Sequence, residues 1–153
     1  MATQRDNPYG AFNFRVTADR FGGDPSAVRA GFQEISGLGM EVTEAEYRNG
    51  NEAENHVRKM NGIYKASDVT LKRGIIGHTD FFDWIKLVRE GDQGVRSTVT
   101  IELMDEAHTG VVMTWKLTNA KPKNYKGATL NAKGGTDVAI EELVLSCEKI
   151  DVS

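Results

Sequence analysis

The stretch at residues 68–88 constrains the fold more than any other, because the spacing of its apolar residues changes within it. Val69 and Leu71 alternate with polar neighbours over residues 68–73, which is the two-residue period of a half-buried strand. Further on, apolar residues recur at steps of three and four, on one face of a helix: Phe81, Phe82, Trp84, Ile85 and Val88. The stretch therefore predicts a strand followed by an α-helix over about residues 79–90, whose aromatic face covers a sheet.

The residues at both ends of this helix favour it. Thr79 belongs to the residue types that cap helix N-termini, and Gly91 to those that end helices. Acidic residues occupy the first turn and basic residues the last, as the helix dipole favours: Asp80, Asp83, Lys86 and Arg89. This is the only substantial helix that the sequence predicts, and the remaining chain reads as mainly β.

Most of the remaining chain predicts strands. In chain order they are residues 9–19, 28–35, 40–48, 56–60, 63–66, 95–103, 111–118 and 138–150. Asn61-Gly62 is a favoured type I′ turn pair, so we expect a tight hairpin there. Residues 122–135 are expected to form a loop, and residues 141–143 are also compatible with a helix.

The strands at 95–103 and 111–118 have the best separated faces, joined by a turn at 105–110. In the second of them we expect Leu117 to face the core and Val112 to lie on the opposite, polar face. Strands with one apolar and one polar face are typical of antiparallel sheets.

Composition sets the class of protein. The chain has 153 residues, which fits one domain at 1–153 with a core that needs no disulfide or metal. A net charge of -3 argues against a basic nucleic-acid-binding face. The single cysteine, Cys147, fits a reducing compartment, and we expect neither a secretory signal nor a membrane anchor. We therefore expect synthesis in the cytoplasm.

No pattern in the sequence predicts an active site. The histidines His56, His78 and His108 are far apart and lack metal-site spacing. Residues 37–39 form a glycine pair without the rest of a dinucleotide motif, and no phosphate loop or nucleophile elbow is present. We predict no catalytic residue, no cofactor and no metal, and so no enzyme.

The strand at 40–48 is unusually polar, with glutamates interleaved among few apolar residues. Exposed strands with polar faces are templates for pairing with another chain, and head-to-tail pairing gives rings or filaments. From the residues alone, such a ring and an ordinary monomeric sandwich both remain open.

An ordered set of segments resembles the inner tail-tube proteins of contractile phages and contractile injection systems. The segments are FNFRV (12–16), GFQEISGL (31–38), EAEYRNG (44–50), VTLKRG (69–74), FFDWI (81–85), TIELMDE (100–106), WKLTNAKP (115–122), LNA (130–132) and VAIEELVL (138–145). They cover nearly the whole chain in the order that the family has.

The resemblance implies a small antiparallel β-barrel or sandwich with one helix, assembled as hexameric rings that stack into a tube. It implies as partners other copies of the chain, a contractile sheath, baseplate or hub proteins, a tail terminator, and a luminal cargo of DNA or protein toxin. The tube would be a structural component of an assembled tail or injection particle, driven through a target envelope. Two alternatives are the ring protein of type VI secretion, which carries effectors, and a monomeric β-barrel that binds a small ligand.

Five charged residues are our candidates for subunit contacts. Lys72 and Arg73 form a basic pair at a strand end, which we expect to be exposed and to face acidic strands. Glu44, Glu46 and Arg48 belong to the polar strand at 40–48, which we expect to find its partners in adjacent subunits.

Overall fold

The computed structural model describes residues 6–18, 32–75, 80–91, 94, 96–135 and 137–153. Its elements are β1 (Phe14–Ala18), β2 (Phe32–Ser36), β3 (Met40–Tyr47), β4 (Arg58–Ala66), β5 (Val69–Gly74), α1 (Asp80–Arg89), β6 (Ser97–Met104), β7 (Val111–Lys126), β8 (Ile140–Ser146) and β9 (Lys149–Val152). The predicted cap Thr79, the histidine His78 and residues 28–31 of the second predicted strand lie outside the described residues.

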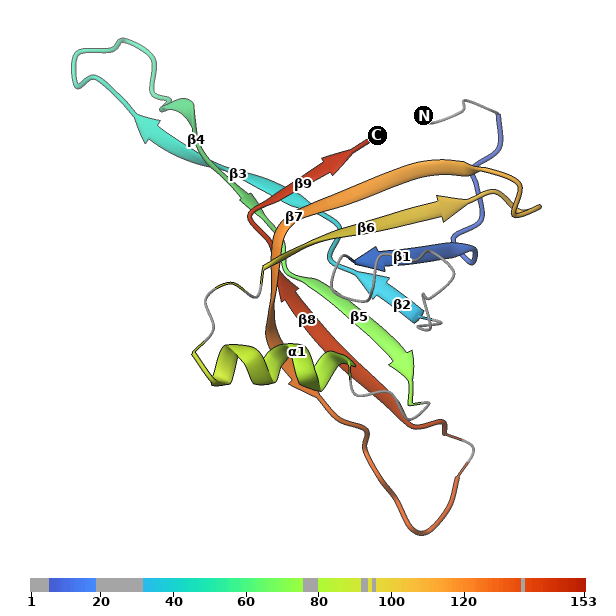
Figure 1. The fold of residues 1–153 in the computed structure, drawn as a ribbon. Coiled ribbons are helices and arrows are strands. Elements are labelled where there is room, and N and C mark those ends of the chain that lie inside the picture. Colours follow the sequence, from blue (N-terminus) through green and yellow to red (C-terminus); the bar gives the residue numbers. More distant parts are fainter. Residues whose placement is uncertain (1–5, 19–31, 76–79, 92–93, 95, 136) are drawn as a thin grey trace.

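Two antiparallel sheets share the long strand β7 and form the body of the molecule (Figure 1). The first half of β7 pairs with β6 and β9, and β1 pairs with β6 at the outer side. The second half pairs with β8, and β5 and β2 follow, in the order β7-β8-β5-β2. Asn119 has a positive φ of 53° where β7 passes from the first sheet to the second. We call the second group of strands the four-stranded sheet.

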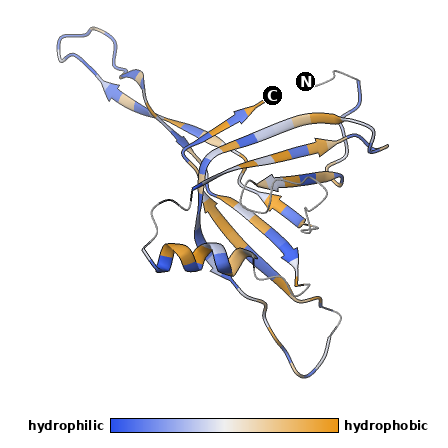
Figure 2. Cartoon of the chain, viewed as in Figure 1, coloured by the Kyte–Doolittle hydropathy of each residue, from blue (hydrophilic) through white to orange (hydrophobic). Residues whose placement is uncertain are grey.

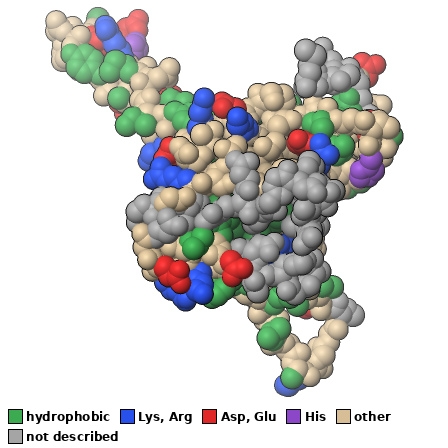
Figure 3. Space-filling view, viewed as in Figure 1, with side chains coloured by type: hydrophobic (Ala, Val, Ile, Leu, Met, Phe, Trp, Pro, Cys, Tyr) green, Lys and Arg blue, Asp and Glu red, His purple; other side chains and the backbone are tan. Residues whose placement is uncertain are grey.

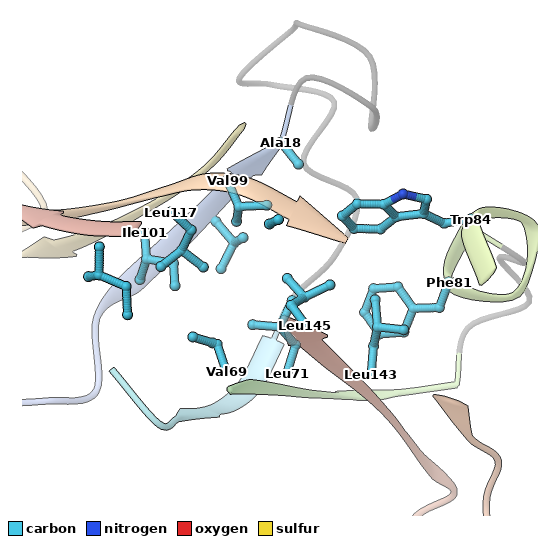
Figure 4. Packing of buried hydrophobic residues seen from close by; sticks show 13 residues of the cluster. Ala18, Val69, Leu71, Phe81, Trp84, Val99, Ile101, Leu117, Leu143 and Leu145 are labelled. Atoms are coloured by element: carbon cyan, nitrogen blue, oxygen red, sulfur yellow. The ribbon is translucent and has the colours of Figure 1, made fainter. Parts of the chain in front are cut away.

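The hydrophobic core lies between the two sheets and the helix (Figure 4). Phe81 and Trp84 of α1 are almost fully buried and lie toward the leucines of β5 and β8. Apolar residues alternate along β5, β6 and β8, which Figure 2 shows as alternating colours. The predicted helix and the predicted alternation of β5 and β6 are therefore confirmed.

The predicted mainly β fold with antiparallel sheets and one helix is confirmed. Of the predicted barrel or sandwich, a closed barrel is not formed, because the strand path is open and ends at β1 and β2. The loop expected at 122–135 is only partly a loop, since β7 continues to Lys126 and pairs with β8. The last predicted strand is two strands, β8 and β9, which belong to different sheets. Val112 is buried against expectation, because a register shift opposite Leu103 and Met104 changes the face it occupies.

The predicted turn at Asn61-Gly62 is also wrong, because β4 runs straight through it. Gly62 and Ile63 together oppose Thr43, so the pair is part of a β-bulge. A Cβ on Gly62 would lie 2.6 Å from Thr43 Oγ1 and 2.9 Å from Thr43 O. Glycine is thus required here for close approach of two strands, and not for a reversal of the chain.

Candidate assembly surfaces

Strands β3 and β4 form an arm that projects from the body (Figure 1). Almost every residue of the arm is exposed, including the large apolar side chains of Ile63 at 74% and Met60 at 54%. An isolated two-stranded sheet is at best marginally stable in water. Figure 3 shows hydrophobic side chains along the arm next to charged ones. The arm therefore has the composition of a surface that is covered by another molecule.

The base of the arm is attached to the body through Tyr64. Its hydroxyl accepts a hydrogen bond from the Ile150 N–H at 3.1 Å and donates one to the Ile150 carbonyl at 3.3 Å. Thr43 holds the bulge, because its hydroxyl accepts from the Ile63 N–H at 2.9 Å and donates to the Ile63 carbonyl at 3.1 Å. These bonds hold the register of the arm where its strands leave the body.

The register sorts the outer half of the arm into two faces, because directly opposed residues lie on the same side of a sheet. One side, the polar tip face, consists of Glu44, Glu46, Lys59 and Asn61. The other, the apolar tip face, consists of Ala45, Tyr47 and Met60 with Arg58 at its end. Near the base the apolar residues Met40, Val42, Tyr64 and Ala66 lie on the same side as the polar tip face. The hydrophobic surface of the arm thus changes sides along its length.

The three arm candidates from the sequence lie at its outer end. Glu44 and Glu46 share the polar tip face, and Glu46 is opposite Lys59. Arg48 follows β3, and its Nη2 donates to the carbonyls of Glu52 and Glu54 at 3.4 Å each. These three residues lie far from the predicted pair at positions 72 and 73, on a different sheet.

Lys72 and Arg73 are neighbours in β5 with opposite environments. Lys72 is 31% exposed, and its Nζ lies 3.6 Å from carboxylate oxygens of both Glu34 and Glu142. Arg73 is only 1% exposed, so the prediction that it forms part of an exposed basic pair is wrong. Alternation within a strand places the two side chains on opposite faces of the sheet.

Arg73 belongs to a buried polar cluster. Its Nε donates to Glu141 Oε1 at 2.5 Å, and the Tyr125 hydroxyl donates to Glu141 Oε2 at 2.9 Å. The guanidinium lies 3.9 Å from the centre of the Phe81 ring, which stacks on Phe32. Burial, and then the bond to Glu141, raise the pKa of Tyr125 above its usual value of 10.0. The cluster joins the helix to β5, β7 and β8.

The outer face of the four-stranded sheet is polar and hollowed. A hollow of about 700 Å³ is lined by residues of this face, among them Glu34, Lys72, Lys126 and Glu142, and by the segment that joins β7 to β8. Leu130 and Val138 of that segment are 85% and 73% exposed. Sequence analysis did not identify these exposed apolar residues, and isolated apolar residues in a loop carry no periodic signal.

Two strand edges of the four-stranded sheet have no partner strand within the described residues. Strand β2 pairs only with β5, and residues 121–126 of β7 pair only with β8. Unpaired edges expose rows of N–H and C=O groups that another strand can bind. With the exposed arm, they indicate a protein that assembles with further chains through its strands.

No helix among the described residues is long and apolar enough to cross a membrane. In the same part of the chain, three or more histidine, cysteine, aspartate or glutamate side chains nowhere gather closely enough to hold a metal ion.

The comparisons identify the family. The model of the T4-like virus tail tube protein gp19 matches residues 10–151, so the chain belongs to this tail tube family. A search of curated proteins found no significant match. In the sheath-tube complex of the extracellular contractile injection system PVC, one chain is 28% identical, with 95% of this chain and 91% of that chain covered and a TM-score of 0.79. With the family shown, the role of the present chain is that of a structural subunit of an inner tube.

Two further solved structures share the fold. A chain of the tube-terminating cap of the anti-feeding prophage has a TM-score of 0.81 at 24% identity, covering 100% of this chain and 95% of that chain. Hcp1 from Flavobacterium johnsoniae has a TM-score of 0.59 at 14% identity, covering 92% of this chain and 94% of that chain.

Proposed function

We propose that six copies of this chain join their four-stranded sheets edge to edge into a ring, and that the rings stack into a hollow tube. The observation that carries the proposal is the pair of open edges on one sheet, in a chain of the tail tube family. The four strands alternate in direction, so β2 and β7 run oppositely. Rotation about an axis along the strands preserves direction, and β2 of one copy then meets β7 of the next as an antiparallel pair.

The polar outer face of this sheet would then line the lumen, since the opposite face is closed by the core and by α1. Thr70, Lys72, Glu142, Val144 and Asn124 lie on that face by their register. A wall that mixes both signs of charge suits the passage of a cargo without adhesion. The cargo in this proposal is DNA or a protein toxin.

The arm is the second proposed contact and docks on a copy in the ring or in the adjacent ring. Its apolar tip face would be buried there, which supplies the cover that an isolated hairpin lacks. Glu44, Glu46 and Arg48 would form polar contacts at the rim, where charged residues contribute little affinity. Lys72 remains a proposed lumen and ring residue. Arg73 would act inside the subunit.

The proposed partners are a contractile sheath around the tube, a baseplate that nucleates it and a terminator that caps it. Similar folds occur in a PVC sheath-tube complex, an anti-feeding prophage baseplate and an anti-feeding prophage tube cap. The subunit would be made in the bacterial cytoplasm, as one domain over residues 1–153, and act without catalysis in an assembled particle.

A type VI secretion ring protein is the second candidate function, favoured by the fold that the chain shares with Hcp1. The identity of 14% to that protein, against 28% to the chain of the PVC sheath-tube complex, ranks it lower. A monomeric ligand-binding barrel is disfavoured, because the open sheet provides no closed barrel around a ligand.

The test is negative-stain electron microscopy of the wild type and of two arm variants, with and without a baseplate fraction. The wild type should give hollow rods of uniform diameter. Tyr47→Ser with Met60→Ser removes the apolar tip face and should leave no rods, because each lost large apolar contact weakens every docking site. Glu46→Ser with Lys59→Ser is the matched control, an opposed pair whose removal leaves the net charge unchanged, and it should retain rods.

Sedimentation velocity distinguishes the remaining outcomes. Wild-type protein that stays monomeric even with baseplate would contradict the tube proposal and favour the monomeric alternative. Rods from the Tyr47 and Met60 variant would contradict the docking of the apolar tip face. Loss of rods only in the Glu46 and Lys59 variant would move the contact to the polar tip face.

A further inference from the structure

One row of charged residues crosses the polar face of the four-stranded sheet. Cross-strand register places Glu34 of β2 beside Lys72 of β5, Lys72 beside Glu142 of β8, and Glu142 beside Lys126 of β7. The signs therefore alternate over all four strands, and the row begins with a carboxylate at one open edge and finishes with an ammonium at the other.

The inner members of the row are already neutralised within the subunit. Lys72 Nζ lies 3.6 Å from Glu34 Oε2 and 3.6 Å from Glu142 Oε1. Lys126 is exposed and has no ion-pair partner among the described residues. Glu34 lies at the other end of the row, and its side chain is 54% exposed. Its strand, β2, has β5 with Lys72 on one side and the open edge of the sheet on the other.

A neighbouring row on the same face has no charged residue. It consists of Ser36, Thr70, Val144 and Asn124, one from each strand and none of them charged. The alternating charges are thus absent from this neighbouring level of the sheet.

We propose that this charge row selects the ring contact: Lys126 of one copy pairs with Glu34 of the next, so that the alternation continues around the ring. The inference rests on the proposed edge-to-edge ring. The occupant of each edge is a second copy of this chain, and the argument is the opposite charge at the two ends of one row.

The same row disfavours the wrong contacts. Pairing of two β2 edges would bring Glu34 residues together, and pairing of two β7 edges would bring Lys126 residues together. Like charges opposed on a sheet are destabilising. Only the head-to-tail contact satisfies both ends. Head-to-tail contacts give rings or filaments, whereas either self-pairing alone gives a dimer.

The test uses two single charge reversals, Glu34→Lys and Lys126→Glu, each alone and in an equal mixture. In either variant alone, every junction opposes like charges. In the mixture, a ring that alternates the two variants pairs opposite charges at every junction. Repulsion inside each subunit, against Lys72 or Glu142, is the same alone and mixed. The mixture therefore isolates the contact between copies.

At about 50 mM salt, each variant alone should need roughly a tenfold higher protein concentration for half-assembly, because reversal turns one attraction per junction into a repulsion. The mixture should assemble at close to the wild-type concentration. Asn124→Asp, on the uncharged row at the β7 edge, is the control and should shift assembly less than either reversal. Circular dichroism melting of each variant checks that its subunit remains folded.

The outcomes separate this inference from the tube proposal. Rings from the wild type and equally from both reversals would overturn the charge row but leave the ring intact. A folded mixture that assembles no better than its components would also overturn it. Absence of rings from the wild type itself, with baseplate present, would overturn the proposed function.

Discussion

Two neighbouring residue pairs of the β5–β8 ladder have almost the same chemistry and opposite surroundings. Arg73 pairs with Glu141 and Lys72 with Glu142, each a cation across from a carboxylate. The side chains of the first pair are 1% and 6% exposed, and those of the second are 31% and 30% exposed. A step of one residue along the strand thus moves an ion pair from the core to the polar face.

The comparison teaches that the environment, more than the residue type, decides what an ion pair does. A buried pair is held by close geometry and further hydrogen bonds, and removal of one partner leaves a charge without compensation. A solvent-exposed pair contributes little to stability, since water screens it. We therefore expect the Arg73 pair to support the integrity of the subunit, and we propose that the Lys72 pair acts in contacts outside it.

The largest expected effect is on the buried pair. Arg73→Met should lower the free energy of unfolding by about 3–5 kcal/mol, because Glu141 would remain buried without its cation. Urea denaturation of the unassembled subunit measures this change. The double variant with Glu141→Leu should recover most of the loss, since both charges are then gone. A loss below about 1 kcal/mol would show that Arg73 is not the compensating group.

The next effect concerns the third member of the buried cluster. Tyr125→Phe removes the donor to Glu141 Oε2 and should cost about 1–2 kcal/mol. The raised pKa of Tyr125 gives a second readout. The protonated Tyr125 hydroxyl contributes fully to the free energy of unfolding below about pH 10. This contribution is lost as the pH rises through the folded-state pKa. The wild type should therefore lose more stability above that pH than the Phe variant, and equal losses would contradict the assignment.

The smallest effect on stability is expected at the exposed pair. Lys72→Ala should change the free energy of unfolding by less than about 1 kcal/mol. Glu34 and Glu142 would then lie on the polar face without the cation between them, so ring formation should become weaker at low salt. Denaturation and sedimentation of the same preparation test both parts. If Lys72→Ala lowered the free energy of unfolding as much as Arg73→Met, the distinction between the two pairs would be contradicted.

Much of the body could be predicted from local pattern. The helix, the alternating strands β5 and β6 and the turn between β6 and β7 each follow from spacing within about ten residues. Family membership followed from motifs that are local as well. The family comparison confirmed that resemblance over residues 10–151.

The assembly surfaces were predicted less completely. Glu44 and Glu46 were singled out as charges in a polar strand, and Lys72 as one of a basic pair at a strand end, whereas Lys126 and Glu34 carry no local signal. Their importance appears only when four strands from distant parts of the chain are placed side by side. Arg73 was misplaced because it was treated as one of an exposed pair at a strand end, although the alternation from Val69 and Leu71 places it on their buried face.

The sequence by itself determined where the helix and the alternating strands form, because propensity and hydrophobic period are properties of a few adjacent residues. It also determined that the chain has charged strands with little apolar surface. Only the tertiary structure decided that Asn61-Gly62 is a bulge, that β7 belongs to two sheets, and that charges from four strands form one row. The physical reason is that pairing between distant strands sets faces and neighbours, and no local spacing contains that information.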